Sequence, residues 1–141
     1  MAIIGGAGNP VGGSFTGPAE ALEIYGDFAA AYSGTIVDST SPITHLSFTT
    51  GNYLFVGEIQ LNAAVDDDNP ANGGASTCMI TFNDRQVALI KAEGEQEKAP
   101  ASVVQPVIIP AYTEVLCVVD STTASGDNYT SVTCTGKIYR E

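Results

Sequence analysis

The 141-residue chain contains no tryptophan, a single histidine and only five Lys or Arg against 16 Asp or Glu, so its formal net charge is −11. No basic residue precedes Arg85. Binding to nucleic-acid phosphates or anionic lipid headgroups needs clustered Lys and Arg. The composition therefore argues against nucleic acid and membranes as partners. It favours a basic protein surface or divalent cations.

Other absences concern membrane spans and catalytic groups. No apolar run reaches the roughly 18 residues that a membrane-spanning helix needs. The sequence has no GxSxG elbow and no second histidine, and His45 alternates with polar neighbours, which predicts an exposed strand histidine. We therefore predict that the protein is not an enzyme and uses no cofactor.

The three cysteines, Cys78, Cys117 and Cys134, lie in apolar, strand-like runs without metal-binding spacing. Their odd number and apolar setting predict buried free thiols. A disulfide between Cys117 and Cys134 across neighbouring strands is the alternative.

What the chain does contain favours strands. An apolar fraction of 44% allows one hydrophobic core, and 15 Gly and 7 Pro among many Thr, Ser and Val residues are typical of short strands joined by turns. We expect eight to nine strands in an all-β, two-sheet antiparallel sandwich with jelly-roll-like or Greek-key connections, and a closed barrel as the second choice. The expected strands are 22–28, 32–37, 43–49, 53–64, a hairpin within 76–93, 103–109, 114–120 and 130–140.

Two segments are especially informative. The hairpin is predicted from alternating apolar residues on both sides of Asn83-Asp84, a pair that tolerates positive φ. The segment Glu114–Asp120 is apolar on both faces, which predicts a doubly covered central strand or an oligomer contact. In contrast, Lys91–Pro100 has mixed charge and is predicted to be a solvated loop without core residues.

Residues 1–18 are rich in glycine and are predicted to form a flexible arm, with residues 19–141 as the single sandwich domain. The arm nevertheless carries four large apolar residues, which suggest that it docks on a neighbouring molecule. These candidate partner-binding residues are Ile3, Ile4, Val11 and Phe15. The alternative is an arm that folds back over its own sandwich.

A second candidate site is the densest group of oxygen ligands in the chain, formed by Asp66, Asp67, Asp68, Asn69 and Asn72. Such a loop could hold Ca²⁺, but it lacks the alternating ligand spacing and final Glu of an EF-hand. The simpler interpretation is a polar loop between two strands. For carbohydrate binding, Tyr112, Tyr129 and Tyr139 are spread out and give a weak signal.

The succession of four segments, Gly51–Leu61, Ile80–Val87, Pro106–Val115 and Thr135–Tyr139, resembles small jelly-roll decoration or cement proteins of tailed bacteriophages. The resemblance covers roughly Gly51–Glu141 and consists of strand-and-turn patterns. It implies an auxiliary capsid protein on the outer surface of a virion, which binds the major capsid protein and is often a homotrimer.

The first functional hypothesis is therefore a structural virion protein that decorates a phage head and stabilises contacts between capsomers. The alternative is a receptor- or glycan-binding jelly-roll domain of a viral fibre or spike, which would use the loop from Asp66 to Gly74 and exposed tyrosines.

Overall fold

The computed structural model describes residues 22–37, 39–64, 75–93, 101–121 and 129–140, which form ten β-strands and no helix. This confirms the all-β prediction, although ten strands exceed the expected eight to nine. The strands are β1 (Glu23–Tyr25), β2 (Phe28–Tyr32), β3 (Ile36–Val37), β4 (Ile43–Thr49), β5 (Leu54–Ala64), β6 (Ala75–Phe82), β7 (Arg85–Glu93), β8 (Ala101–Ile109), β9 (Glu114–Ser121) and β10 (Tyr129–Tyr139).

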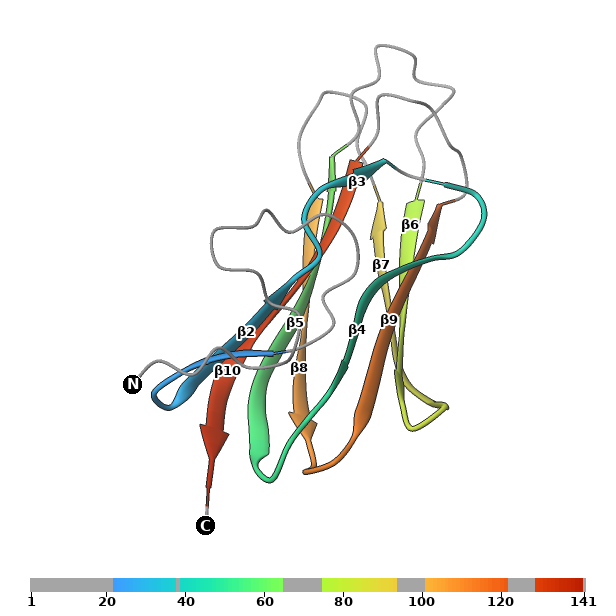
Figure 1. Ribbon diagram of the computed structural model, residues 1–141. Helices are drawn as coiled ribbons and strands as arrows, with labels where there is room; N and C mark the ends of the chain where they lie inside the picture. The colour runs from blue at the N-terminus through green and yellow to red at the C-terminus, as the bar shows by residue number, and fades with distance from the viewer. Residues whose placement is uncertain (1–21, 38, 65–74, 94–100, 122–128, 141) are drawn as a thin grey trace.

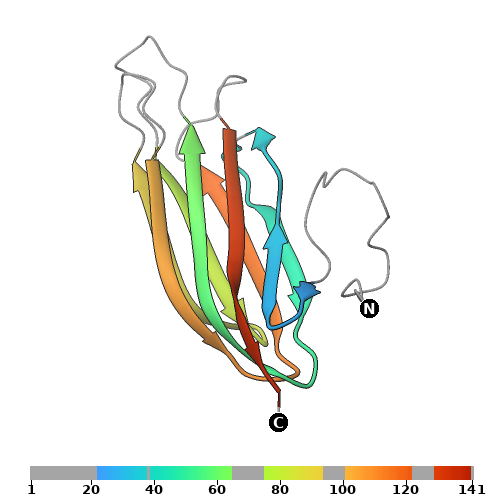
Figure 2. The same ribbon diagram turned by 90° about the vertical axis from the view of Figure 1, so that its left-hand side faces the viewer.

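The strands form two antiparallel sheets that face each other (Figures 1 and 2). The six-stranded sheet has the order β1-β2-β10-β5-β8, with β3 also paired to β10. The four-stranded sheet has the order β4-β9-β6-β7. The fold is thus the predicted sandwich, and the closed barrel is not observed.

The connections cross repeatedly between the sheets. From β2 and β3 the chain passes to β4, returns to β5, forms the β6–β7 hairpin in the four-stranded sheet, and crosses to β8, β9 and β10 in turn. This interleaving is the jelly-roll arrangement. It places β10, the last strand, between β2 and β5 in the middle of its sheet (Figure 2).

The strands from β4 onward begin and end within two residues of the predicted bounds. The strand expected over 22–28 is wrong, because a turn at Gly26 and Asp27 divides it into β1 and the beginning of β2. Gly26 has a φ of 63°, which suits glycine. The predicted loop 91–100 also begins too early, since β7 runs to Glu93 and Ala92 is buried in the core.

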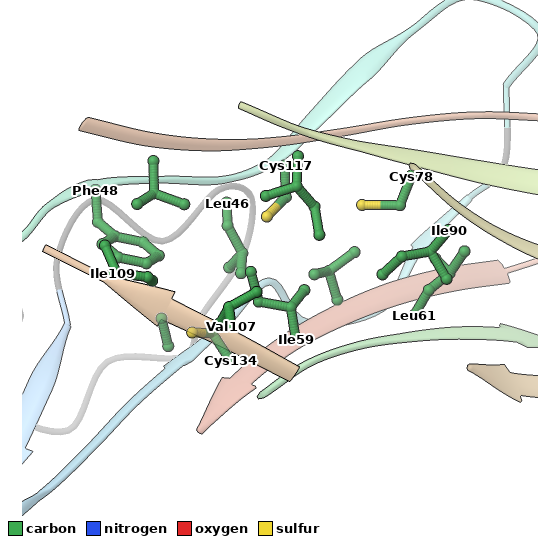
Figure 3. Close-up of a cluster of buried hydrophobic side chains, with 14 of the residues drawn as sticks. Leu46, Phe48, Ile59, Leu61, Cys78, Ile90, Val107, Ile109, Cys117 and Cys134 are labelled. Carbon is green, nitrogen blue, oxygen red and sulfur yellow. The ribbon is translucent and has the colours of Figure 1, made fainter. Parts of the chain in front are cut away.

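The core lies between the two sheets. Figure 3 shows Leu46, Cys78 and Cys117 of the four-stranded sheet facing Ile59, Val107 and Cys134 of the six-stranded sheet. All three cysteines are buried and free, as predicted, so the alternative of a Cys117–Cys134 disulfide is wrong. A hydrogen bond with Cys78 and burial raise the pKa of Cys117, and burial raises the pKa of Cys134 to about 12. The thiols of Cys117 and Cys134 therefore stay protonated at neutral pH.

One place in the six-stranded sheet depends on glycine. Gly57 and Gly136 are opposite each other on β5 and β10. A Cβ atom on Gly57 would collide with the backbone oxygen of Thr135, and one on Gly136 with the backbone oxygen of Val56. The buried ring of Phe55 lies 2.8 Å from either Cβ position, so it fills the space that both glycines leave open.

The β6–β7 hairpin is closed by Asn83 and Asp84, with φ values of 50° and 65°. Positive φ at both turn residues is the type I′ geometry that suits the twist of two-residue hairpins. The side-chain oxygen of Asn83 also accepts a hydrogen bond from the backbone N–H of Glu114 at 2.9 Å. The turn is thereby tied to the start of β9, and the hairpin prediction is confirmed.

Candidate binding surface

The outer face of the six-stranded sheet carries several exposed aromatic side chains. In β1 and β2 the tight turn at Gly26 and Asp27 pairs Tyr25 with Phe28, which is 61% exposed. Strand β10 adds Tyr139, which is 55% exposed and projects from the same side of the sheet. Aromatic side chains of this size are normally at least partly covered, so their exposure marks a candidate site of contact.

Strand register arranges these residues in rows. Phe28 on β2 is opposite Lys137 on β10, which in turn is opposite Val56 on β5. The ammonium nitrogen of Lys137 lies 5.3 Å from the centre of the Phe28 ring, a cation–π distance. Ile108 on β8 continues the row beyond Val56. An almost continuous apolar band therefore crosses the sheet.

The aromatic side chains surround a hollow of about 540 Å³. This volume falls within the usual range of ligand and anchor-residue pockets. We call it the aromatic hollow, and its lining residues are Glu23, Tyr25, Phe28, Ala29, Ala30, Tyr32, Val56, Thr135, Gly136, Lys137 and Tyr139.

Charge in the aromatic hollow is balanced. Glu23 and Lys137 supply one carboxylate and one ammonium group. The hydroxyl of Tyr25 donates a hydrogen bond to Oε2 of Glu23 at 3.0 Å, and this bond, together with the charge of the carboxylate, raises the pKa of Tyr25. The hollow thus offers aromatic rings and a few polar groups, a combination that suits non-covalent binding of a partner or ligand.

His45 does not belong to this surface, and its predicted exposure is wrong. A β-bulge between Thr44 and Leu46 breaks the alternation of β4 and turns His45 inward, where it is 1% exposed. Nδ1 lies 3.0 Å from the carbonyl oxygen of Ile43 and Nε2 lies 2.8 Å from Oγ1 of Thr130. Because a carbonyl only accepts, Nδ1 carries the proton and Nε2 accepts from Thr130. Burial lowers the pKa of His45.

This histidine and threonine are both buried in the core. They satisfy each other's hydrogen-bonding groups and do not line the aromatic hollow. Within the part of the chain that the structure describes, no three His, Cys, Asp or Glu side chains are grouped to hold a metal ion. The same residues contain no helix long and apolar enough to cross a membrane.

The arm residues Ile3, Ile4, Val11 and Phe15, and the candidate calcium ligands Asp66, Asp67, Asp68, Asn69 and Asn72, lie outside the described residues.

Of the three tyrosines considered from the sequence, only Tyr139 lines the aromatic hollow. Tyr112 lies in the turn between β8 and β9, and Tyr129 lies at the opposite end of β10. Sequence reasoning missed Tyr25 and Phe28, although the Gly-Asp pair between them is a hairpin signal that could have placed them side by side.

A scan against protein-family models gave no match for this chain, and no curated protein matches it.

Proposed function

We propose that this chain is a non-catalytic structural virion protein that decorates the outside of a phage head and stabilises contacts between capsomers. The single observation that carries the proposal is the aromatic hollow, an exposed aromatic surface on a sandwich of net charge −11. The jelly-roll order of the strands agrees with the family that the sequence resembles. Fold alone does not specify a function, and it is the exposed aromatic surface that points to a binding role.

Tyr is, with Trp and Arg, among the residue types that most often dominate the energy of protein interfaces, and Phe is enriched in their buried cores. Tyr25, Phe28 and Tyr139 offer such anchors, and the net charge of −11 favours a partner with a basic surface. On a capsid the same contact is repeated many times. If copies of the protein are also joined to each other, their individually modest contacts with the shell act together and bind with high total avidity.

The test compares two exposed tyrosines on the same strand. Tyr139→Ala removes an aromatic wall of the hollow, whereas Tyr129→Ala removes a tyrosine from the other end of β10 and serves as the matched control. Co-sedimentation with phage heads that lack this protein should show binding weakened about tenfold or more by Tyr139→Ala. Equal binding of both variants and the unaltered protein would overturn the role of the hollow.

The arm provides a second part of the proposal, which comes from the sequence. Ile3, Ile4, Val11 and Phe15 are proposed to contact a neighbouring capsid subunit. Deletion of residues 1–17 should abolish attachment to heads while circular dichroism shows an intact sandwich. Undiminished attachment would remove the arm from the mechanism.

The second candidate function is glycan or receptor binding at a fibre or spike, and one observation favours it. The hollow gathers Tyr25, Tyr32 and Tyr139 beside Glu23 and Thr135, a combination of rings and hydrogen-bonding groups that suits a neutral sugar. Binding on a glycan array that Tyr139→Ala abolishes, with no attachment to heads, would replace decoration by this function. Loss of that binding on Ca²⁺ chelation would implicate the loop 66–74 as well.

A further inference from the structure

The outer face of the four-stranded sheet is also apolar. Leu89 is 60% exposed, Val87 is 46% exposed and Met79 is 36% exposed, while Leu116 and Val118 beside them are half-buried. We call these five residues the Met79 face. The described strands of the other sheet all lie on the opposite, inner side (Figure 1). Among the described residues, the Met79 face thus remains without a covering layer.

Strand register gives this face an internal order about β6. Met79 on β6 is flanked by Leu89 on β7 and by Val118 on β9. One row further along, Thr77 on β6 is flanked by Lys91 on β7 and by Asp120 on β9. The Met79 row therefore has an apolar residue on each side of β6, and the Thr77 row has a basic residue on one side and an acidic residue on the other.

This order is self-complementary. If a second copy faces the first about a two-fold axis that runs along β6, β7 of each copy lies over β9 of the other. Leu89 then meets Val118 of the second copy, and Met79 meets its own counterpart at the axis. Lys91 meets Asp120 twice by symmetry. Lys91 also has an interaction within its own chain, which a lysine with three donors can keep.

We propose that the Met79 face binds a second copy of this chain, in a face-to-face pair with its two-fold axis along β6. With the axis along β6, strands β9, β6 and β7 of each copy overlap those of the other, and at a spacing of about 4.8 Å over about eight residues each they cover roughly 380 Å² in projection. This area lies at the small end of specific interfaces, below the ~800 Å² per partner of a standard one, so the matched rows of side chains supply the specificity of the pair. The pairing uses the side of the sandwich opposite to the aromatic hollow, so it stands independently of the proposed capsid contact.

A partner of different sequence is less well matched. The apolar row of Leu89, Met79 and Val118 lies next to one basic and one acidic residue, so it offers no net charge to a basic protein. The same row is complementary to a second copy turned about the two-fold axis. The sequence resemblance favours a homotrimer, but an isologous contact of this kind closes after two copies. The mass of the particle in solution therefore distinguishes the two.

The first experiment measures mass by sedimentation equilibrium of the full chain over a concentration series. We expect a dimer of twice the 14.5 kDa chain mass. Met79→Glu places two like charges at the axis and should weaken the pair at least tenfold. The matched control Ile108→Glu changes a residue of 62% exposure on the other sheet and should leave the dimer intact. Circular dichroism confirms that both variants fold.

The second experiment reverses the charges. Lys91→Asp alone places two pairs of acidic residues in contact and should weaken the dimer, and Asp120→Lys alone should weaken it in the same way. The double variant restores opposite charges and should recover dimerisation. A monomer at all concentrations, a trimer, equal weakening by Ile108→Glu, or absence of rescue in the double variant would each overturn the proposed pairing.

Discussion

Single residues inside this sandwich have sharply defined surroundings, and His45 is the clearest case. It is held neutral in the core between the carbonyl of Ile43 and the hydroxyl of Thr130. Desolvation lowers the pKa of His45 from its ordinary value of about 6.5. As the pH falls through 6.5, the unfolded chain gains a proton that the folded protein resists. Protonation of this residue therefore favours unfolding under mildly acidic conditions.

We predict a pH-dependent stability difference between the protein and His45→Gln, which does not titrate. At pH 7.5 the variant should be less stable by about 1–3 kcal/mol, because buried hydrogen bonds are lost. Between pH 7 and pH 5 this gap should narrow, since only the histidine-containing protein is penalised by protonation of its unfolded state. Urea unfolding at several pH values measures the gap, and a gap independent of pH would contradict the prediction.

The glycine pair leads to a second prediction at this scale. Gly57→Ala or Gly136→Ala should lower the free energy of unfolding by about 2 kcal/mol or more, because the added methyl group overlaps backbone atoms and crowds Phe55. Glu58→Ala changes the next residue on β5, which is exposed, and should shift stability by less than about 0.5 kcal/mol. Urea denaturation midpoints compare the three variants, and equal effects would refute the steric argument.

At the level of elements, the β6–β7 hairpin is specified locally by its turn. Asp84 adopts a φ of 65°, which costs a residue with a side chain more than glycine. We predict that Asp84→Gly stabilises the protein by about 0.5 kcal/mol and that Asp84→Val destabilises it by at least about 1 kcal/mol. Thermal unfolding midpoints should follow the order Gly, Asp, Val, and the reverse order would exclude a turn of this type.

The sequence predicted features that are specified locally, as this turn is, and missed features that depend on residues far apart in the chain. Strand β5 alternates over many residues with one face in the core, so pattern alone located it and its buried side chains. Pattern also located β9, but both of its faces are apolar, so the sequence did not show which of them is buried in the core. Strands β1 to β3 are short and β1 is at a sheet edge, where alternation is weak. The bulge that buries His45 leaves no periodic signal, because one irregular residue changes which face the next side chain occupies.

The aromatic hollow was hidden for a different reason. Its walls come from β1, β2, β5 and β10, and these strands meet only through strand register, although β1 and β10 are more than 100 residues apart in the chain. Periodicity within one segment cannot show which segments become neighbours. The two apolar faces of Glu114–Asp120, in contrast, were visible in the sequence. Strand β9 is a central strand, but no described strand covers its outer face, which includes Leu116 and Val118, so the predicted double cover is not observed among the described residues.

For the whole molecule, charge sets the response to salt. With 16 carboxylates and five basic side chains, the folded state concentrates like charge that the unfolded chain can spread apart. Raising NaCl from about 10 mM to about 200 mM shortens the screening length from roughly 30 Å to 7 Å. We predict that the thermal midpoint rises by about 2–5 °C at pH 7.5. The same addition at pH 4.5, where carboxylates begin to protonate, should have a smaller effect, and a fall at pH 7.5 would contradict this view.

The position of β10 has a consequence for how the chain reaches its native state. Because β10 inserts between β2 and β5, the central ladder of the larger sheet cannot close until the chain through Tyr139 has left the ribosome. Pairing partners so remote in sequence are also slow to find each other. A chain that ended after β9 and before residue 129 would leave the facing edges of β2 and β5 unpaired and open to aggregation.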